Sequence, residues 1–171
     1  IINLLRDHLL DAELVFGDET VIQVLKETGR AAQSKSYLWA QMNGSGPLVR
    51  LFGYAPDRGG THAEQLYAGI RKGAVLMSDG YEVYNGIAKS HQLIHLGCWA
   101  HARRYFVEAE AALPKAARRP DQLATQFIAA IARLYAVEAK AKDKSVPERA
   151  QLREASSRPI LAEIQHLLVT H

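Results

Sequence analysis

The sequence is poor in cysteine and in long apolar runs. Cys98 is the single cysteine among 171 residues, which excludes an internal disulfide and favours a reducing compartment. No apolar run approaches the roughly 20 residues of a membrane-spanning helix, and no stretch resembles a signal peptide. We therefore expect a cytoplasmic protein that has no membrane partner.

A strong excess of charge is also missing. The formal net charge is +3 and the pI is about 9.0, which is only mildly basic. The first 99 residues hold nine Lys/Arg and ten Asp/Glu, whereas the rest holds twelve Lys/Arg and eight Asp/Glu. A basic C-terminal part is compatible with a polyanionic partner and equally with a solvated helical surface.

No internal repeat is visible, and the chain changes character near its middle. Up to about residue 98 the apolar pattern predicts the order β-β-β-α-β-α-β. The predicted strands cover 13–25, 37–43, 48–55, 74–77 and 91–98. Beyond Trp99 the pattern predicts only helices, over 99–113, 121–143 and 147–169. The fold class is therefore α/β, a mixed sheet followed by an all-helical segment.

Several residues predict where these helices begin or break. Thr61 and Asp121 are candidate N-caps, and Ser145 with Glu148 fits a capping box. Pro159 lies inside the last predicted helix and should kink or split it.

Two aspartates stand out because each interrupts or ends an apolar strand. Asp18 lies inside the first strand, and Asp79 follows the fourth. In this topology the first and fourth strands can be neighbours, which would bring the two carboxylates together. Adjacent carboxylates repel each other unless a cation lies between them, and their hard oxygens favour Mg²⁺ or Mn²⁺.

Other interpretations of these residues remain open. Asp79 with the next glycine is typical of a turn. Asp18 could cap a loop or pair with Arg58 or Lys72. Glu19 should point away from Asp18, because side chains alternate along a strand, and is expected to be exposed or salt-bridged.

The segment "CWAHARRYF" (98–106) permits a zinc interpretation and a structural one. Cys98 and His101 are possible zinc ligands, and His91 and His95 could add nitrogens. A structural zinc site needs about four ligands, and a second cysteine is missing. The structural alternative is the start of a helix, with Cys98 buried and Trp99 in the core.

Five motifs in order resemble one known family. They are "FGDET", "YLWA", "YAPDRGG", "SDGYEVYN" and "CWAHARRYF", between residues 15 and 106. They resemble the catalytic domain of bacterial transposases of the insertion-sequence sixty-six family, which are DDE transposases with a ribonuclease H-like fold. The later helical region also resembles that family. The resemblance implies a ribonuclease H-like core at 1–106 and a helical insertion at 107–171.

The resemblance also implies an activity. Asp18 and Asp79 match the first two acidic residues of a site that holds two Mg²⁺ (or Mn²⁺) ions and attacks phosphorus in line. The implied function is DNA cleavage and strand transfer at transposon ends. Its partners would be double-stranded DNA and further copies of the protein, in a bacterial cytoplasm and at the nucleoid. By the same analogy His101, Arg103 and Arg104 would contact DNA, with Cys98 and Trp99 near the active site.

One part of the family pattern is missing. The third acid, a glutamate in an Asp/Asn/Arg-rich segment, is not found in this chain. We therefore expect a catalytic-domain fragment that is inactive alone. The alternatives are a ribonuclease H-like nuclease or resolvase, which would only hydrolyse, and a non-catalytic DNA-binding or assembly relic. An aspartate-nucleophile phosphatase is disfavoured because Thr20 occupies the position of its second aspartate.

Overall fold

The computed structural model describes residues 1–170, which form two compact units. The sheet unit is Ile1–Cys98, and the helical unit begins at Trp99. Sequence analysis placed the boundary after residue 106, which lies inside helix α4 (Trp99–Ala111). The assignment of 1–106 and 107–171 as functional domains stays a prediction.

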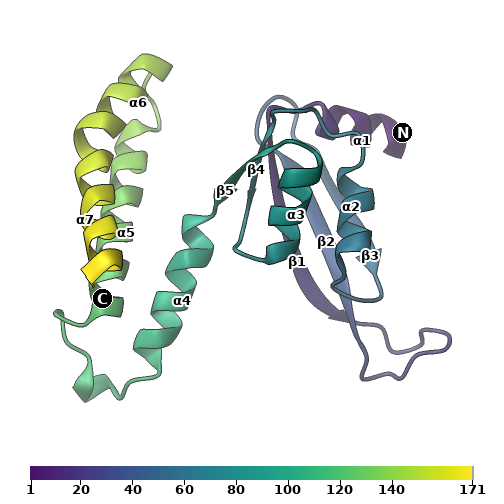
Figure 1. Ribbon diagram of the computed structural model, residues 1–171, viewed down its shortest axis with the longest axis horizontal. Helices are drawn as coiled ribbons and strands as arrows, with labels where there is room; N and C mark the ends of the chain where they lie inside the picture. Colours follow the sequence, from purple (N-terminus) through teal and green to yellow (C-terminus); the bar gives the residue numbers. More distant parts are fainter. Residues whose placement is uncertain (171) are drawn as a thin grey trace. The chain divides into compact units, whose positions relative to one another are not determined.

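The sheet unit contains five strands and three helices (Figure 1). In chain order they are α1 (Ile2–Leu10), β1 (Leu14–Gln23), β2 (Lys35–Asn43), β3 (Arg50–Ala55), α2 (Gly60–Tyr67), β4 (Val75–Ser78), α3 (Glu82–Ser90) and β5 (Ile94–Gly97). The predicted order β-β-β-α-β-α-β is confirmed. β1, β3 and β5 are shorter than predicted, whereas β2 begins two residues earlier and β4 is shifted by one residue.

The sheet is mixed, with the order β3-β2-β1-β4-β5. β1, β2 and β3 form an antiparallel meander, whereas β4 and β5 run parallel to β1. The expected pairing of the first and fourth strands is present, with Phe16 opposite Met77. This register determines where the two aspartates lie.

One face of the sheet forms the core of the unit. Val15, Trp39 and Leu76 point to this face and are buried with Tyr67 of α2 and Tyr84 of α3. Figure 1 shows α2 and α3 over the same face of the sheet. The other face carries the alternate residues, and there Phe52 is 63% and Ile94 55% exposed.

The helical unit has its own core. Besides α4 it contains η1 (Lys115–Ala117), α5 (Leu123–Ala141), α6 (Val146–Leu152), the π-helical turn η2 (Arg153–Ser157) and α7 (Arg158–Thr170). α5 buries Phe127, Ile131 and Leu134 against Ile164 and its neighbours on α7, whereas Leu123 and Tyr135 of the same apolar stripe are exposed. The Phe127 ring also stacks on Phe106 of α4, with centroids 4.2 Å apart.

The capping predictions had mixed outcomes. The capping box of Ser145 and Glu148 is confirmed at the start of α6. Thr61 and Asp121 are not N-caps, because α2 is preceded by Gly59 and α5 by Gln122. The predicted break near Pro159 is confirmed as η2. The break lies there because a proline cannot donate to the carbonyl four residues earlier, that of Ala155, which is part of the π turn.

Candidate active site

Asp18 lies inside β1, and Asp79 directly follows β4, the parallel neighbour of β1. The last residues that pair between these strands are Phe16 and Met77, so Asp18 and Asp79 each lie two residues beyond that pair. If the alternation of side chains continues past the end of β4, both carboxylates are on one face. Neighbouring strands are separated by about 4.8 Å, a span that carboxylates on one face can bridge through a single ion. Asp18 is on the face that carries Phe52, opposite to α2 and α3, because it pairs with Ala40, which pairs with Phe52.

Both carboxylates are oriented by backbone groups. Oδ1 of Asp18 accepts the N–H of Glu19 at 2.9 Å, and Oδ1 of Asp79 accepts the N–H of Tyr81 at 3.0 Å. Asp18 is exposed and Asp79 half-buried, so an ion and its water ligands could reach both. Two converging carboxylates are the oxygen ligands that Mg²⁺ and Mn²⁺ prefer, and the residues present therefore fit part of such a site.

Glu19 points to the opposite face, as the alternation predicts. Its side chain is only 2% exposed, and its carboxylate is paired with the Arg58 guanidinium. Oε2 accepts the hydroxyl proton of Tyr84 at 2.6 Å. The predicted salt bridge is confirmed, whereas an exposed Glu19 is not observed. Arg58 pairs with Glu19, the neighbour of Asp18.

The helix-covered face beside Glu19 is filled by two buried tyrosines. Burial raises the pKa of Tyr84 well above its usual range, and the neighbouring Tyr67 and the hydrogen bond to Glu19 raise it further. Burial likewise raises the pKa of Tyr67, against a smaller opposite effect of its hydrogen bond with Gln41. Both hydroxyls stay protonated at neutral pH. Tyr84 therefore remains a hydrogen-bond donor to the Glu19 carboxylate.

A second polar network is centred on Ser78, the residue directly before Asp79. The Ser78 hydroxyl is 2.8 Å from Nε2 of His95, and Nδ1 of His95 donates to Oδ1 of Asn85 at 2.8 Å. Ser78 is buried and its hydroxyl also donates to the carbonyl oxygen of Asp79. The N–H of Cys98 donates to the Ser78 carbonyl oxygen at 2.9 Å. This network connects α3, β4 and β5 directly before Asp79.

Sequence analysis missed the roles of several of these residues. Arg58 was considered only as a partner of Asp18, and Tyr84 had no role. His95 was considered only as a zinc ligand. One signal for the tyrosine packing was present in the sequence. Gly17 lies inside a strand of large residues, and a glycine there leaves room for an aromatic ring on the helix-covered face.

The zinc interpretation of the Cys98 segment receives no support from the geometry. Both ring nitrogens of His95 are engaged in the Ser78 and Asn85 contacts, and Nε2 of His91 lies 2.9 Å from Glu64. Throughout residues 1–170, no three His, Cys, Asp or Glu side chains are grouped so that they could hold a metal ion. The two aspartates alone are therefore an incomplete ligand set.

The remaining predicted site residues lie in or next to α4. Cys98 is half-buried at the end of the sheet unit, beside β4. Trp99 is 39% exposed, so its predicted place in a core is wrong. His101 and Arg103 are half-buried on the first turns of α4, and Arg104 is exposed. Their contacts with DNA stay predictions.

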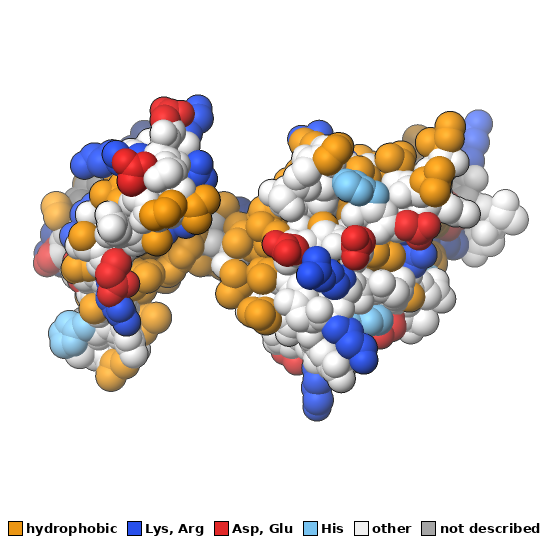
Figure 2. Space-filling view, turned by 90° about the horizontal axis from the view of Figure 1, so that it is seen from above, with side chains coloured by type: hydrophobic (Ala, Val, Ile, Leu, Met, Phe, Trp, Pro, Cys, Tyr) orange, Lys and Arg blue, Asp and Glu red, His pale blue; other side chains and the backbone are white. Residues whose placement is uncertain are grey.

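The helical unit offers ion pairs on its surface, together with one shallow pocket. Figure 2 shows acidic and basic side chains interspersed over this unit. Arg153 pairs with Glu138, and Arg133 with Glu163. A pocket of about 590 Å³ is lined by Trp99, Leu134 and Arg153 among others.

Among the described residues, no helix is at once long and apolar enough to cross a bilayer.

Comparisons with known proteins place the chain in a family. The sequence profile described as "Transposase IS66 family" matches residues 1–171. Two similar proteins come from Sinorhizobium fredii (strain NBRC 101917 / NGR234). The uncharacterized protein y4qI is 30% identical over 97% of this chain and 32% of its own length, and the uncharacterized protein y4jD is 29% identical over 91% and 31%. The chain thus spans about a third of the length of these relatives.

One similar solved structure is a cryo-electron microscopy structure of a simian T-cell lymphotropic virus intasome in complex with the PP2A regulatory subunit B56 gamma. The match has a TM-score of 0.35 and 12% identity, and it covers 63% of this chain and 45% of the matched chain.

Proposed function

The chain belongs to the IS66 family of transposases, and from this premise we propose that its sheet unit is the ribonuclease H-like part of a DDE-type active site. Asp18 and Asp79 are two of its three metal-binding carboxylates. The substrate is double-stranded DNA at transposon ends. The observation that carries the proposal is the parallel pairing of β1 with β4, in which Phe16 and Met77, each two residues before one of the aspartates, lie opposite each other.

The bound divalent ions would supply activation of a water or 3′-hydroxyl nucleophile and stabilisation of the leaving oxygen. The chain's own residues hold the ligands in place. The backbone N–H groups of Glu19 and Tyr81 orient the two carboxylates. His101, Arg103 and Arg104 contact the DNA backbone, and the arginines suit this role because their forked donors match phosphate oxygens.

The helical unit is the insertion that follows this core, and the active assembly contains several copies of the protein. Because the described residues offer no third ligand near the two aspartates, the isolated chain binds metal weakly and does not cleave DNA. The protein acts on DNA in the bacterial cytoplasm, at the nucleoid.

Paramagnetic broadening by Mn²⁺, followed by amide NMR of this chain, tests the metal assignment. We expect selective broadening at residues 17–19 and 79–80. In Asp18→Asn or Asp79→Asn we expect no such broadening at Mn²⁺ concentrations up to ten times the wild-type midpoint. Each substitution removes one of the two carboxylate ligands. The control is Asp121→Asn, at an exposed aspartate of the helical unit.

Selective broadening that survives both substitutions, or that is absent in the wild type, would refute the metal assignment. The DNA chemistry is tested in a full-length relative that carries the same two aspartates. We expect products of strand transfer as well as of hydrolysis, and neither after Asp→Asn at either position. Hydrolysis alone would favour a nuclease.

A further inference from the structure

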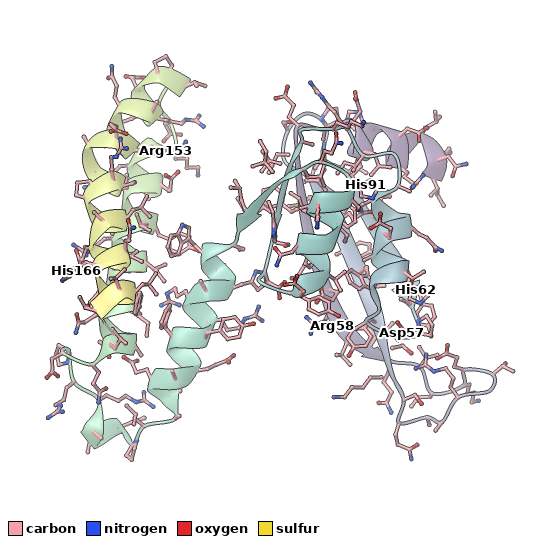
Figure 3. All side chains as sticks on the ribbon, viewed as in Figure 1. Asp57, Arg58, His62, His91, Arg153 and His166 are labelled. Atoms are coloured by element: carbon pink, nitrogen blue, oxygen red, sulfur yellow. The ribbon has the colours of Figure 1, made fainter. Side chains whose placement is uncertain are left out.

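Arg58 contacts residues close in sequence to both aspartates, Glu19 after Asp18 and Tyr81 after Asp79. It lies in the loop between β3 and α2, and Figure 3 labels it near the end from which α2 starts. Its Nε donates to Oε1 of Glu19 at 2.8 Å, and Nη2 donates to the same oxygen. The guanidinium is thereby bound to the residue that directly follows Asp18.

The two side chains of the pair differ in exposure, and the buried Glu19 carboxylate needs Arg58 as its charge partner. The Glu19 side chain is 2% exposed, whereas that of Arg58 is 42% exposed. A buried carboxylate is costly unless it is paired and hydrogen-bonded. Burial alone would lower the pKa of Arg58, but the hydrogen bond and the charge of Glu19 outweigh this and raise it. Arg58 therefore stays charged and holds Glu19 in place.

The same arginine also holds the residue that orients Asp79. Its guanidinium carbon lies 3.8 Å from the centroid of the Tyr81 ring, and the Tyr81 hydroxyl donates to the Arg58 carbonyl oxygen at 2.9 Å. The N–H of Tyr81 in turn donates to Oδ1 of Asp79. A continuous series of contacts thus runs from Glu19 through Arg58 and Tyr81 to Asp79.

We propose that Arg58 is a positioning residue that sets the distance between Asp18 and Asp79 through Glu19 on one side and Tyr81 on the other. The inference rests on the proposed function, because it assigns a role at the same metal site. Lysine cannot replace arginine here. The flat guanidinium both donates through two nitrogens to Glu19 and stacks on the Tyr81 ring, whereas an ammonium group is a point charge.

The variants are chosen to separate positioning from mere charge compensation. Arg58→Lys keeps the positive charge next to Glu19 but loses the two guanidinium nitrogens that donate to Glu19 and the flat surface that stacks on the Tyr81 ring. Tyr81→Phe keeps the ring under Arg58 but removes the hydroxyl that bonds its carbonyl oxygen. The matched control is Arg30→Lys, which alters another arginine of the sheet unit that is paired with a glutamate. Arg30 contacts Glu27, Ser36 and Tyr54, and this network is separate from the contacts of Arg58.

Two measurements on this chain are made by NMR. Without metal, hydrogen exchange of the Tyr81 amide reports its bond to Asp79. With Mn²⁺, the midpoint of broadening at residues 79–80 reports the shared site. In Arg58→Lys and Tyr81→Phe we expect faster Tyr81 exchange and a midpoint raised by about tenfold, the lower end of the losses that follow removal of an outer-shell partner. Arg30→Lys should change neither.

The outcomes separate this inference from the proposed function. Wild-type broadening with unchanged midpoints in Arg58→Lys and Tyr81→Phe would overturn the positioning role and leave the metal assignment intact. No broadening in the wild type would overturn the metal assignment. In that case hydrogen exchange of the Tyr81 amide decides. Faster exchange in Arg58→Lys but not in Arg30→Lys supports the link from Arg58 to Asp79. Exchange at the wild-type rate in both arginine variants overturns that link.

Discussion

Replacing Gly17 with alanine should destabilise the sheet unit, although alanine is normally the better residue in regular structure. A Cβ atom at this position would lie 2.2 Å from the Tyr67 hydroxyl oxygen and 3.0 Å from the Tyr84 ring. The Tyr67 side chain is 1% exposed and packed in the core, so it cannot swing away. Either the ring or strand β1 has to move.

The size of the effect follows from two opposing terms. Overpacking a well-filled core costs about 1–3 kcal/mol. Alanine regains about 0.5–1 kcal/mol because it restricts the unfolded chain more than glycine does. The net loss is about 1–2 kcal/mol. For a unit of this length, each kcal/mol lowers Tm by roughly 4–8 °C, so Tm should fall by roughly 4–16 °C.

Thermal and urea unfolding followed by fluorescence measure this loss. Trp39 is a suitable probe because it is buried in the core of the sheet unit, with its ring 6.0 Å from that of Tyr84. Trp99→Phe is introduced into every protein compared, so that Trp39 alone reports. A Tyr67→Phe background removes the clashing oxygen, and there Gly17→Ala should cost far less. The difference between the two backgrounds is the coupling energy.

Gly86→Ala is the matched control. Gly86 lies inside α3, and a Cβ atom there would meet nothing within 4 Å. This substitution should stabilise the unit by up to about 1 kcal/mol. If Gly17→Ala is as stable as the parent, or if Tyr67→Phe does not relieve its cost, the packing argument is wrong.

Two further predictions concern the helical unit. Ser145→Ala removes half of the capping box of α6 and should cost about 1 kcal/mol; unchanged hydrogen-exchange protection of the α6 amides would contradict this. The hydrogen bond from Arg153 lowers the pKa of Glu138 below its ordinary 4.5, so the pair stabilises the fold above that pH and ceases to do so as the pH falls through the lowered value. Urea unfolding of Glu138→Gln should therefore match the wild type more closely at pH 3 than at pH 6, with a difference at pH 6 below about 1 kcal/mol because both side chains are about half exposed; equal differences at the two pH values would refute the assignment.

Local pattern was sufficient for much of the fold. The alternation of side chains predicted that Glu19 and Asp18 point to opposite faces, and the apolar run before Asp79 predicted a buried strand. The capping box at Ser145 was likewise correct. These features depend on residues close together in the chain, and for that reason they can be inferred without coordinates.

The sequence by itself determined the order of the elements, the family, and two aspartates, one inside an apolar strand and one directly after another such strand. Tertiary structure alone decided the register of β1 with β4, in which Phe16 lies opposite Met77, and that Arg58 pairs with Glu19 and stacks on Tyr81. Strand register and ring packing depend on contacts between residues far apart in the chain. No local preference specifies such contacts, because their free energy appears only when the sheet and its helices have packed together.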